Sequence, residues 1–136
     1  MPTSDFAESA RILDKKRCWK QVVEASQIIT VLESGRKAWS NHPAVLMWKG
    51  YIPALKNYYN VFWWESVHNR GVKAVKLQPF SDISYAILPP WIGNEEFHAS
   101  HRSNLLRKDR EYYSKFGWTE PDNLPYIWPS KDLVYV

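Results

Sequence analysis

The fold is decided by residues 41–71, whose sequence is NHPAVLMWKGYIPALKNYYNVFWWESVHNRG. Asn41 is a preferred helix N-cap, and Gly71 is a residue type at which helices commonly end. The apolar residues between them cover most of a helix circumference, which predicts burial on several sides. Pro53 has no N–H to donate, so we expect a kink there or a split near Gly50. The stretch therefore predicts a central helix that other helices surround.

Two further helices are predicted before this stretch. A short one begins near Ser4 or Asp5, because acidic residues favour the first turn of a helix. A longer one runs from about Lys15 to Leu32 and ends before Gly35. Its inward positions step by three or four residues, the period of a helix face. They are Cys18, Val22, Ala25, Ile29 and Leu32.

The second half of the chain has a less regular pattern. Residues 72–93 contain three prolines, which predicts an extended or irregular loop. Asn94 is expected to cap a short helix, residues 100–115 to form a longer one, and Gly117 to end it. The tail after Gly117 is rich in proline and aromatic residues, and we expect it to pack back on the core.

Length and composition fit one compact domain over residues 1–136, an all-α helical bundle around the central helix. The 21 aromatic residues (eight Trp, eight Tyr, five Phe) exceed the needs of a core of this size, which favours stacking or wedging surfaces. The single cysteine, Cys18, fits a reducing compartment. We find no signal peptide and no apolar run of the ~20 residues that a membrane helix needs. An intracellular protein, cytoplasmic or viral and not secreted, is expected.

The net charge of +4 is unevenly distributed. Residues 11–20 carry five basic and one acidic residue, and residues 101–115 carry five basic and two acidic residues. Two basic segments on an otherwise slightly acidic chain indicate a localised anionic partner such as nucleic acid. Two helix faces exposed to solvent would have the same charge pattern. Charge alone therefore does not decide between an anionic partner and simple solvent exposure.

Most sequence motifs of enzymes are missing. There is no glycine-rich phosphate loop, no Gly-x-Ser-x-Gly turn and no cysteine cluster for zinc. His98 and His101 are three apart but have no third ligand, so we expect no metal and no cofactor, and polar or phosphate contacts beside Arg102 instead. Glu24 lies one turn beyond Lys20 on a basic helix face, where a simple i,i+4 ion pair competes with a catalytic role.

Several segments together resemble the pyrimidine-dimer DNA glycosylase and abasic-site lyase family. LDKKRCWKQVVEASQII (13–29) is similar to the first long helix of that family, and NHPAVLMWKG (41–50) with NRG (69–71) to its central helix. HASHRSNLLRKDREYYSKFGW (98–118) resembles its basic C-terminal helix and aromatic segment. Together with PPWIG and YIWP, these motifs are closest to a little-characterised branch of the family. The resemblance covers most of the chain and implies a small all-α fold.

The resemblance implies a mechanism as well. The nucleophile would be the α-amino group of Pro2, exposed once Met1 is removed; it would attack C1′ of a sugar, expel the base and form an iminium before strand cleavage. An amine with a pKa of about 8 has an appreciable neutral fraction at neutral pH. Glu24 corresponds to the catalytic glutamate, which would stabilise the cationic intermediate and transfer protons.

Double-stranded DNA would be the partner of a monomeric enzyme of this family. Basic and aromatic side chains are the candidates for contacts to phosphates and to a flipped-out nucleotide. They are Lys16, Arg17, Lys20, His42, His101, Arg102, Arg107, Lys108, Tyr112, Tyr113 and Trp118.

Two alternatives stay open. The first is a catalytically silent DNA-binding protein, suggested by the uncharged Val22 and Val23 beside Glu24 and by a Met1 that would block the Pro2 amine. The second is a structural protein that uses the fold in an assembly with protein partners and has its tryptophan-rich tail as an interface.

Overall fold

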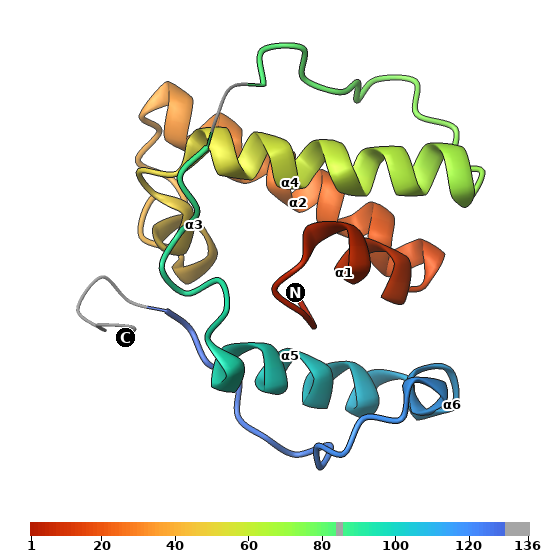
Figure 1. Cartoon of the computed structure of the whole chain (residues 1–136). Coiled ribbons are helices and arrows are strands. Elements are labelled where there is room, and N and C mark those ends of the chain that lie inside the picture. Colours follow the sequence, from red (N-terminus) through yellow and green to blue (C-terminus); the bar gives the residue numbers. More distant parts are fainter. Residues whose placement is uncertain (84–85, 130–136) are drawn as a thin grey trace.

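The computed structural model describes residues 1–83 and 86–129, and all regular structure within these ranges is helical (Figure 1). The prediction of an all-α fold is confirmed. No helix of the described residues is long and apolar enough to cross a membrane. The α-helices are α1 (Phe6–Ile12), α2 (Lys15–Ser34), α3 (Pro43–Trp48), α4 (Ile52–Trp64), α5 (Glu95–Lys108) and α6 (Arg110–Tyr113). One π-helical turn, Glu65–Asn69, extends α4, and one 3-10 turn, Ser114–Phe116, follows α6.

The predicted central helix is two helices, split at the expected place. Gly50 has a φ of +86°, a left-handed conformation that ends the path of α3 before α4 begins. Pro53 lies in the first turn of α4, where a missing N–H costs nothing. The prediction of Asn41 as N-cap is wrong, because the Nδ1 atom of the next residue, His42, accepts the hydrogen bond from Ala44 N instead.

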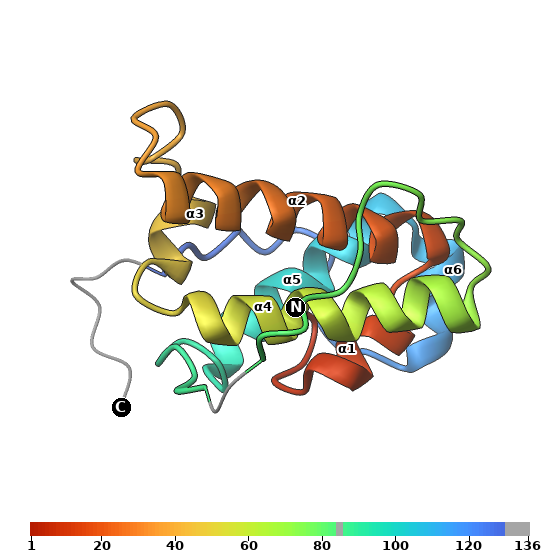
Figure 2. The ribbon, with the colours of Figure 1, turned by 90° about the horizontal axis from the view of Figure 1, so that it is seen from above.

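The long helices α2 and α4 run antiparallel, side by side, and form the main layer of the core (Figure 2). Asp14 caps the start of α2, and Gly35 ends it with a φ of +67°. The facing residues are fully buried: Cys18 and Val22 on α2, and Phe62 on α4. The α4 helix is covered on several sides, as its apolar circumference predicts.

The segment 72–83 lies along the outer side of α4 and is irregular, as predicted. It is held by side chains of α4 that bond to its backbone. Tyr59 Oη donates to Gln78 O at 2.9 Å, and Trp63 Nε1 donates to Leu77 O at 2.8 Å. The amide of Asn60 bonds to both N–H and C=O of Phe80. This segment is thus a cover for α4.

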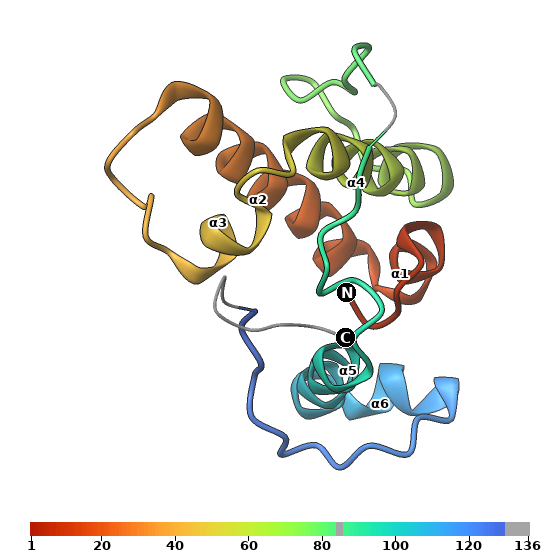
Figure 3. The same ribbon diagram turned by 60° about the vertical axis from the view of Figure 1, so that its left-hand side comes forward.

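The α5 helix lies apart from the α2–α4 layer, with the first residues of the chain between them (Figures 1 and 3). Asn94 caps it as predicted, but the helix continues from Glu95 to Lys108 and breaks at Asp109, which caps α6. The predicted single helix over 100–115 is therefore wrong in both boundaries. The tail packs back along α5 as expected, with Leu124 N donating to Ser103 Oγ. The remainder of the predicted tail, 130–136, lies outside the described residues.

Candidate active site

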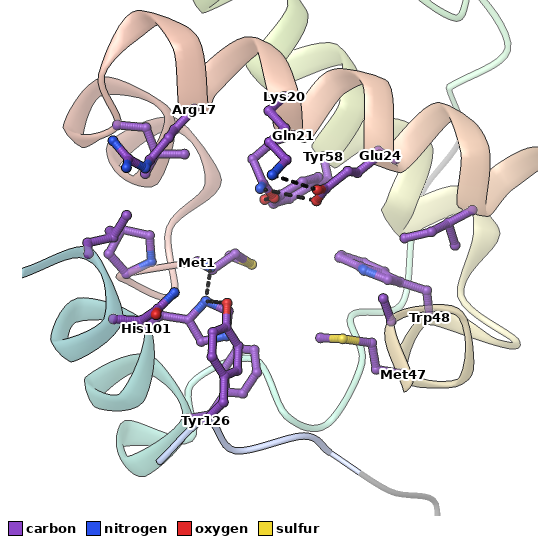
Figure 4. Close-up of a pocket in the computed structure, with 18 of the residues that line it drawn as sticks. Met1, Arg17, Lys20, Gln21, Glu24, Met47, Trp48, Tyr58, His101 and Tyr126 are labelled. Atoms are coloured by element: carbon purple, nitrogen blue, oxygen red, sulfur yellow. Dashed lines mark hydrogen bonds and ion pairs between the residues drawn. The ribbon is translucent and has the colours of Figure 1, made fainter. Parts of the chain in front are cut away.

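A cavity of about 210 Å³ lies between α2, α3, α4, α5 and the first two residues (Figure 4). It brings the chain's first residue together with Glu24 and with side chains from both basic segments. Its polar and charged lining consists of Arg17, Lys20, Gln21, Glu24, Tyr58, His101, Asn104, Lys108 and Tyr126.

The α-amino group of Met1 is buried at the floor of this cavity. Its nitrogen lies 2.8 Å from His101 Nδ1. Burial lowers the pKa of the amine from 8.0 to about 5. Burial, followed by the nearby amine, also holds the pKa of His101 well below 6.5. Both groups are neutral at pH 7; we assign the ring proton to Nε2, so that Nδ1 accepts an N–H and the amine lone pair stays free.

Hydrogen bonds from α5 hold the first two residues in place. His98 Nε2 accepts the N–H of Gly93 at 3.0 Å, so its proton is on Nδ1, which donates to Met1 O at 2.9 Å. Arg102 Nη1 donates to Pro2 O at 2.8 Å. His98 and His101, one turn apart, thus contact the carbonyl and the amine of the same residue. The amine is positioned before any ligand binds.

Arg102 is a positioning residue, which corrects its expected role as a phosphate contact. Its guanidinium pairs with Glu95 and with Glu120, and its side chain is only 12% exposed. The N–H groups of the guanidinium therefore donate to the Glu95 and Glu120 carboxylates and to the Pro2 carbonyl. An arginine with three such partners has little capacity left for DNA.

Replacing Arg102 by methionine is expected to lower the free energy of unfolding by about 1–3 kcal/mol and to slow reactions of the terminal amine. Loss of the guanidinium leaves the mostly buried Glu120 without its partner. Arg110→Met is the matched control, because the Arg110–Asp122 pair is exposed and such pairs contribute less than about 1 kcal/mol. Urea unfolding measures both variants, and equal midpoints would contradict the positioning role.

Glu24 lies on α2, on the wall of the cavity that faces the amine (Figure 4). Its carboxylate is half-exposed, pairs with Lys20 Nζ at 3.8 Å, and has Gln21 Nε2 at 3.5 Å. Tyr58 Oη, from α4, donates to Gln21 Oε1 at 2.8 Å and fixes that side chain. The predicted ion pair with Lys20 is present, and Glu24 also faces the cavity. It does not hydrogen-bond to the amine, so the space between them is open to a ligand.

The mouth of the cavity is basic. Arg17 and Lys20 of α2 face Lys108 of α5 across it. Burial lowers the pKa of Lys108, and repulsion from Lys20 and then Arg17 lowers it further. Arg17 is also paired with Asp14 at 3.1 Å. The three side chains together make the mouth positively charged, which suits an anion such as a phosphate.

Two other predicted phosphate contacts lie outside the cavity lining. Lys16 is exposed on α2. Arg107 is exposed on α5, where it donates to Asn104 Oδ1 at 2.7 Å and to Asp122 O at 3.2 Å. Neither is a neighbour of the amine.

The expected DNA contact of Tyr113 is wrong. Its ring is fully buried, and its hydroxyl bonds to the Asp14 carboxylate at the start of α2. Trp118 is stacked on that ring, with centroids 5.8 Å apart, and Tyr112 is half-buried beneath Lys115. None of the three aromatic residues lines the cavity.

The cavity has other aromatic residues, which the sequence interpretation did not select. Tyr126 and Trp128, from the YIWP motif, line it near His101. Their spacing of two in an extended segment places both side chains on one side, and this spacing was the available sequence clue. His42 is exposed at the N-cap of α3 and lies edge-on to Trp128, with centroids 6.2 Å apart.

Metal-binding side chains are not grouped in residues 1–83 and 86–129: no three of His, Cys, Asp and Glu lie in a suitable cluster there. The cavity itself presents the amine beside His101, the Glu24 carboxylate and the basic mouth.

Comparison with known proteins identifies the N-terminal part. The family model described as pyrimidine dimer DNA glycosylase matches residues 1–77. This region holds α1 to α4 and Glu24, whereas His98, His101 and the rest of α5 lie beyond it. No curated protein and no solved structure matches the chain.

Proposed function

Because the chain belongs to the pyrimidine dimer DNA glycosylase family, we propose that it is a DNA repair glycosylase with abasic-site lyase activity on pyrimidine dimers or related lesions. The observation that carries this proposal is a buried, neutral amine in a cavity with Glu24 and a basic mouth. A terminal ammonium would normally be solvated, and burial makes it the nucleophilic amine at neutral pH.

The reaction begins with attack of the amine lone pair on C1′ of the damaged nucleotide. The N–C1′ bond forms while the C1′–N bond to the base breaks, and the electron pair leaves with the base, which takes a proton from solvent. His101 Nδ1 accepts the proton that the attacking nitrogen loses. Protonation at O4′ then opens the sugar to a cationic imine, which the Glu24 carboxylate stabilises. The Glu24 carboxylate then takes the C2′ proton, and the C3′–O bond breaks with its electron pair leaving on the 3′ phosphate, which completes the strand nick.

The residue that supplies the amine depends on whether Met1 is present. While Met1 is present, the Pro2 nitrogen is part of an amide and cannot attack. Pro2 is fully buried and lines the same cavity, so removal of Met1 would leave a secondary amine there. The proposal therefore holds for either residue, with an imine at Met1 or an iminium at Pro2.

DNA recognition follows from the charge around the cavity. Arg17, Lys20 and Lys108 at the mouth, with Lys16 and Arg107 farther out, are suited to neutralise phosphates of a duplex. The cavity of about 210 Å³ is large enough to receive a base, so a nucleotide at the lesion would be flipped out of the stack toward it. A role in DNA repair, rather than DNA binding as such, supports an intracellular location.

Borohydride trapping on an abasic-site duplex tests the activity. A covalent adduct that mass spectrometry locates on the N-terminal residue supports the proposal and identifies Met1 or Pro2 as the nucleophile. An adduct on Lys20 or Lys108 would contradict the nucleophile assignment. DNA binding without any adduct would overturn the enzyme in favour of the silent DNA-binding protein. The Glu24–Lys20 ion pair, which is the ordinary structural role of such a carboxylate, favours that alternative.

A further inference from the structure

Aromatic side chains form a row that leads from the surface into the cavity. In order, its members are Trp39, His42, Trp128, Tyr126 and His101, and each ring contacts the next with centroids 4.7–6.2 Å apart. We call these five residues the aromatic row. It joins the segment between α2 and α3, the C-terminal segment and α5, so three distant parts of the chain contribute to it.

The outer members of the row are unusually exposed for their size. Trp39 is 71% exposed, Trp128 43% and Tyr126 39%. Trp128 and Tyr126 are stacked, with an angle of 20° between the rings, so they present a flat, stable surface. Large rings left in water in contiguous positions are typical of a binding surface rather than of a core.

Trp39 also has a strained backbone. Its φ is +69°, and it is the one non-glycine residue with a positive φ among the described residues. A bulky residue in this conformation costs about 1–2 kcal/mol. In this conformation its ring lies against that of His42, with centroids 5.5 Å apart, and not in the core. The chain thus bears a cost to keep a tryptophan in the row.

The charges beside the row select its ligand. Arg36 and Lys37 are exposed in the same segment as Trp39, and Lys20 and Lys108 are at the cavity mouth. Aromatic faces between cations are the combination that binds unpaired nucleic-acid strands, because bases stack on the rings and phosphates contact the cations. An apolar protein surface would cover the aromatic rings but would not compensate the charges of these cations.

We propose that the aromatic row is a stacking site for unpaired DNA bases, which guides the strand toward the cavity. The inference rests on the proposed function in assuming a DNA substrate, but it concerns binding and not chemistry. It assigns roles to Trp39, His42, Tyr126 and Trp128 that a cavity alone does not require.

The test uses a single-stranded oligothymidylate of about ten nucleotides with one 2-aminopurine, a length within the usual range of such sites. Stacking on an aromatic ring quenches 2-aminopurine, whereas a purely electrostatic contact does not. We expect Trp39→Ala and Trp128→Ala each to weaken binding by about 5- to 150-fold and to reduce the quenching. Trp128→Phe, which keeps a ring, is expected to retain most of both.

Trp64→Ala is the matched control, since Trp64 is 52% exposed on α4 but lies outside the row, stacked on His68. It should leave affinity and quenching unchanged, and circular dichroism verifies that all variants fold. Unchanged quenching in both Trp39→Ala and Trp128→Ala would overturn the inference. So would wild-type protein that ignores the oligonucleotide but self-associates through these residues.

The binding test and the trapping experiment fail independently. Quenching without a covalent adduct keeps the stacking site and rejects the lyase. An adduct without quenching keeps the lyase and rejects the stacking site.

Discussion

Replacing Glu24 by glutamine is expected to lower strand nicking by about 10²- to 10⁴-fold and to leave DNA affinity nearly unchanged. The change keeps the shape of the side chain but removes the charge that faces the amine across the cavity. Without it, the cationic imine loses its counter-charge and the proton transfers lose their acceptor, and such groups commonly contribute a factor of this size. DNA affinity depends on the cations of the mouth, which the variant retains. Nicking of an abasic-site duplex and salt-dependent binding measure the two effects.

Glu33→Gln is the control for this experiment. Glu33 is on the same helix, is similarly exposed and pairs with Lys56, outside the cavity lining. Its replacement should leave nicking at the wild-type rate. Survival of nicking in Glu24→Gln would show that the carboxylate is not part of the mechanism.

Adduct formation is expected to persist to unusually low pH. A protonated amine has no lone pair, so the reaction rises with pH through the pKa of the amine, which burial lowers to about 5. At pH 6.5 such an amine is about 30-fold more abundant in its neutral form than an ordinary terminal amine with a pKa of about 8. Because the amine and His101 share a hydrogen bond, their titrations are coupled. The pH at which the trapping rate is half-maximal therefore reports on both groups and not on the amine alone. The initial rate of borohydride trapping as a function of pH measures it.

A synthetic peptide of the first residues serves as the reference, because its amine is solvated and should titrate near pH 8. A protein profile that coincides with that of the peptide would mean that the amine is solvated in the active form. The same lowered pKa affects stability: between pH 8 and 5 the unfolded chain binds more protons than the folded chain, so stability falls as pH falls through this range.

Local chemistry predicted the elements of the fold well. Asn94 caps the helix that it was expected to cap, and Gly117 ends the last helical turn with a φ of +70°. The first helix begins close to the predicted Ser4 or Asp5, but Asp5 is its N-cap and not part of its first turn. These features depend on residues within one turn of each other. The N-cap of α3 was predicted one residue too early, at Asn41 instead of His42. Both side chains can accept a hydrogen bond from the first turn of a helix, and the local sequence does not show which of the two does so.

The site was predictable only in part, because its partners are far apart in sequence. Arg102 and Tyr113 are of residue types that often contact DNA. In the structure, however, Arg102 pairs with Glu120 and donates to Pro2 O, and Tyr113 bonds to Asp14. Nothing within a helical turn of either residue indicates those partners. The aromatic residues of the cavity were missed for the same reason, since Tyr126 gains its role from contact with His101 of another element.

The contacts between the first residues and α5 determine when the site forms during synthesis. Met1 meets His101, and Asp14 meets Tyr113, across about a hundred residues of chain. A ribosome adds about 5–20 residues per second, so α5 emerges at least several seconds after the N-terminus. Contacts of such high sequence separation also form late in folding, because loop closure must come first. The cavity therefore closes around the first residues only after α5 has been made, so the site is assembled late in the synthesis and folding of the chain.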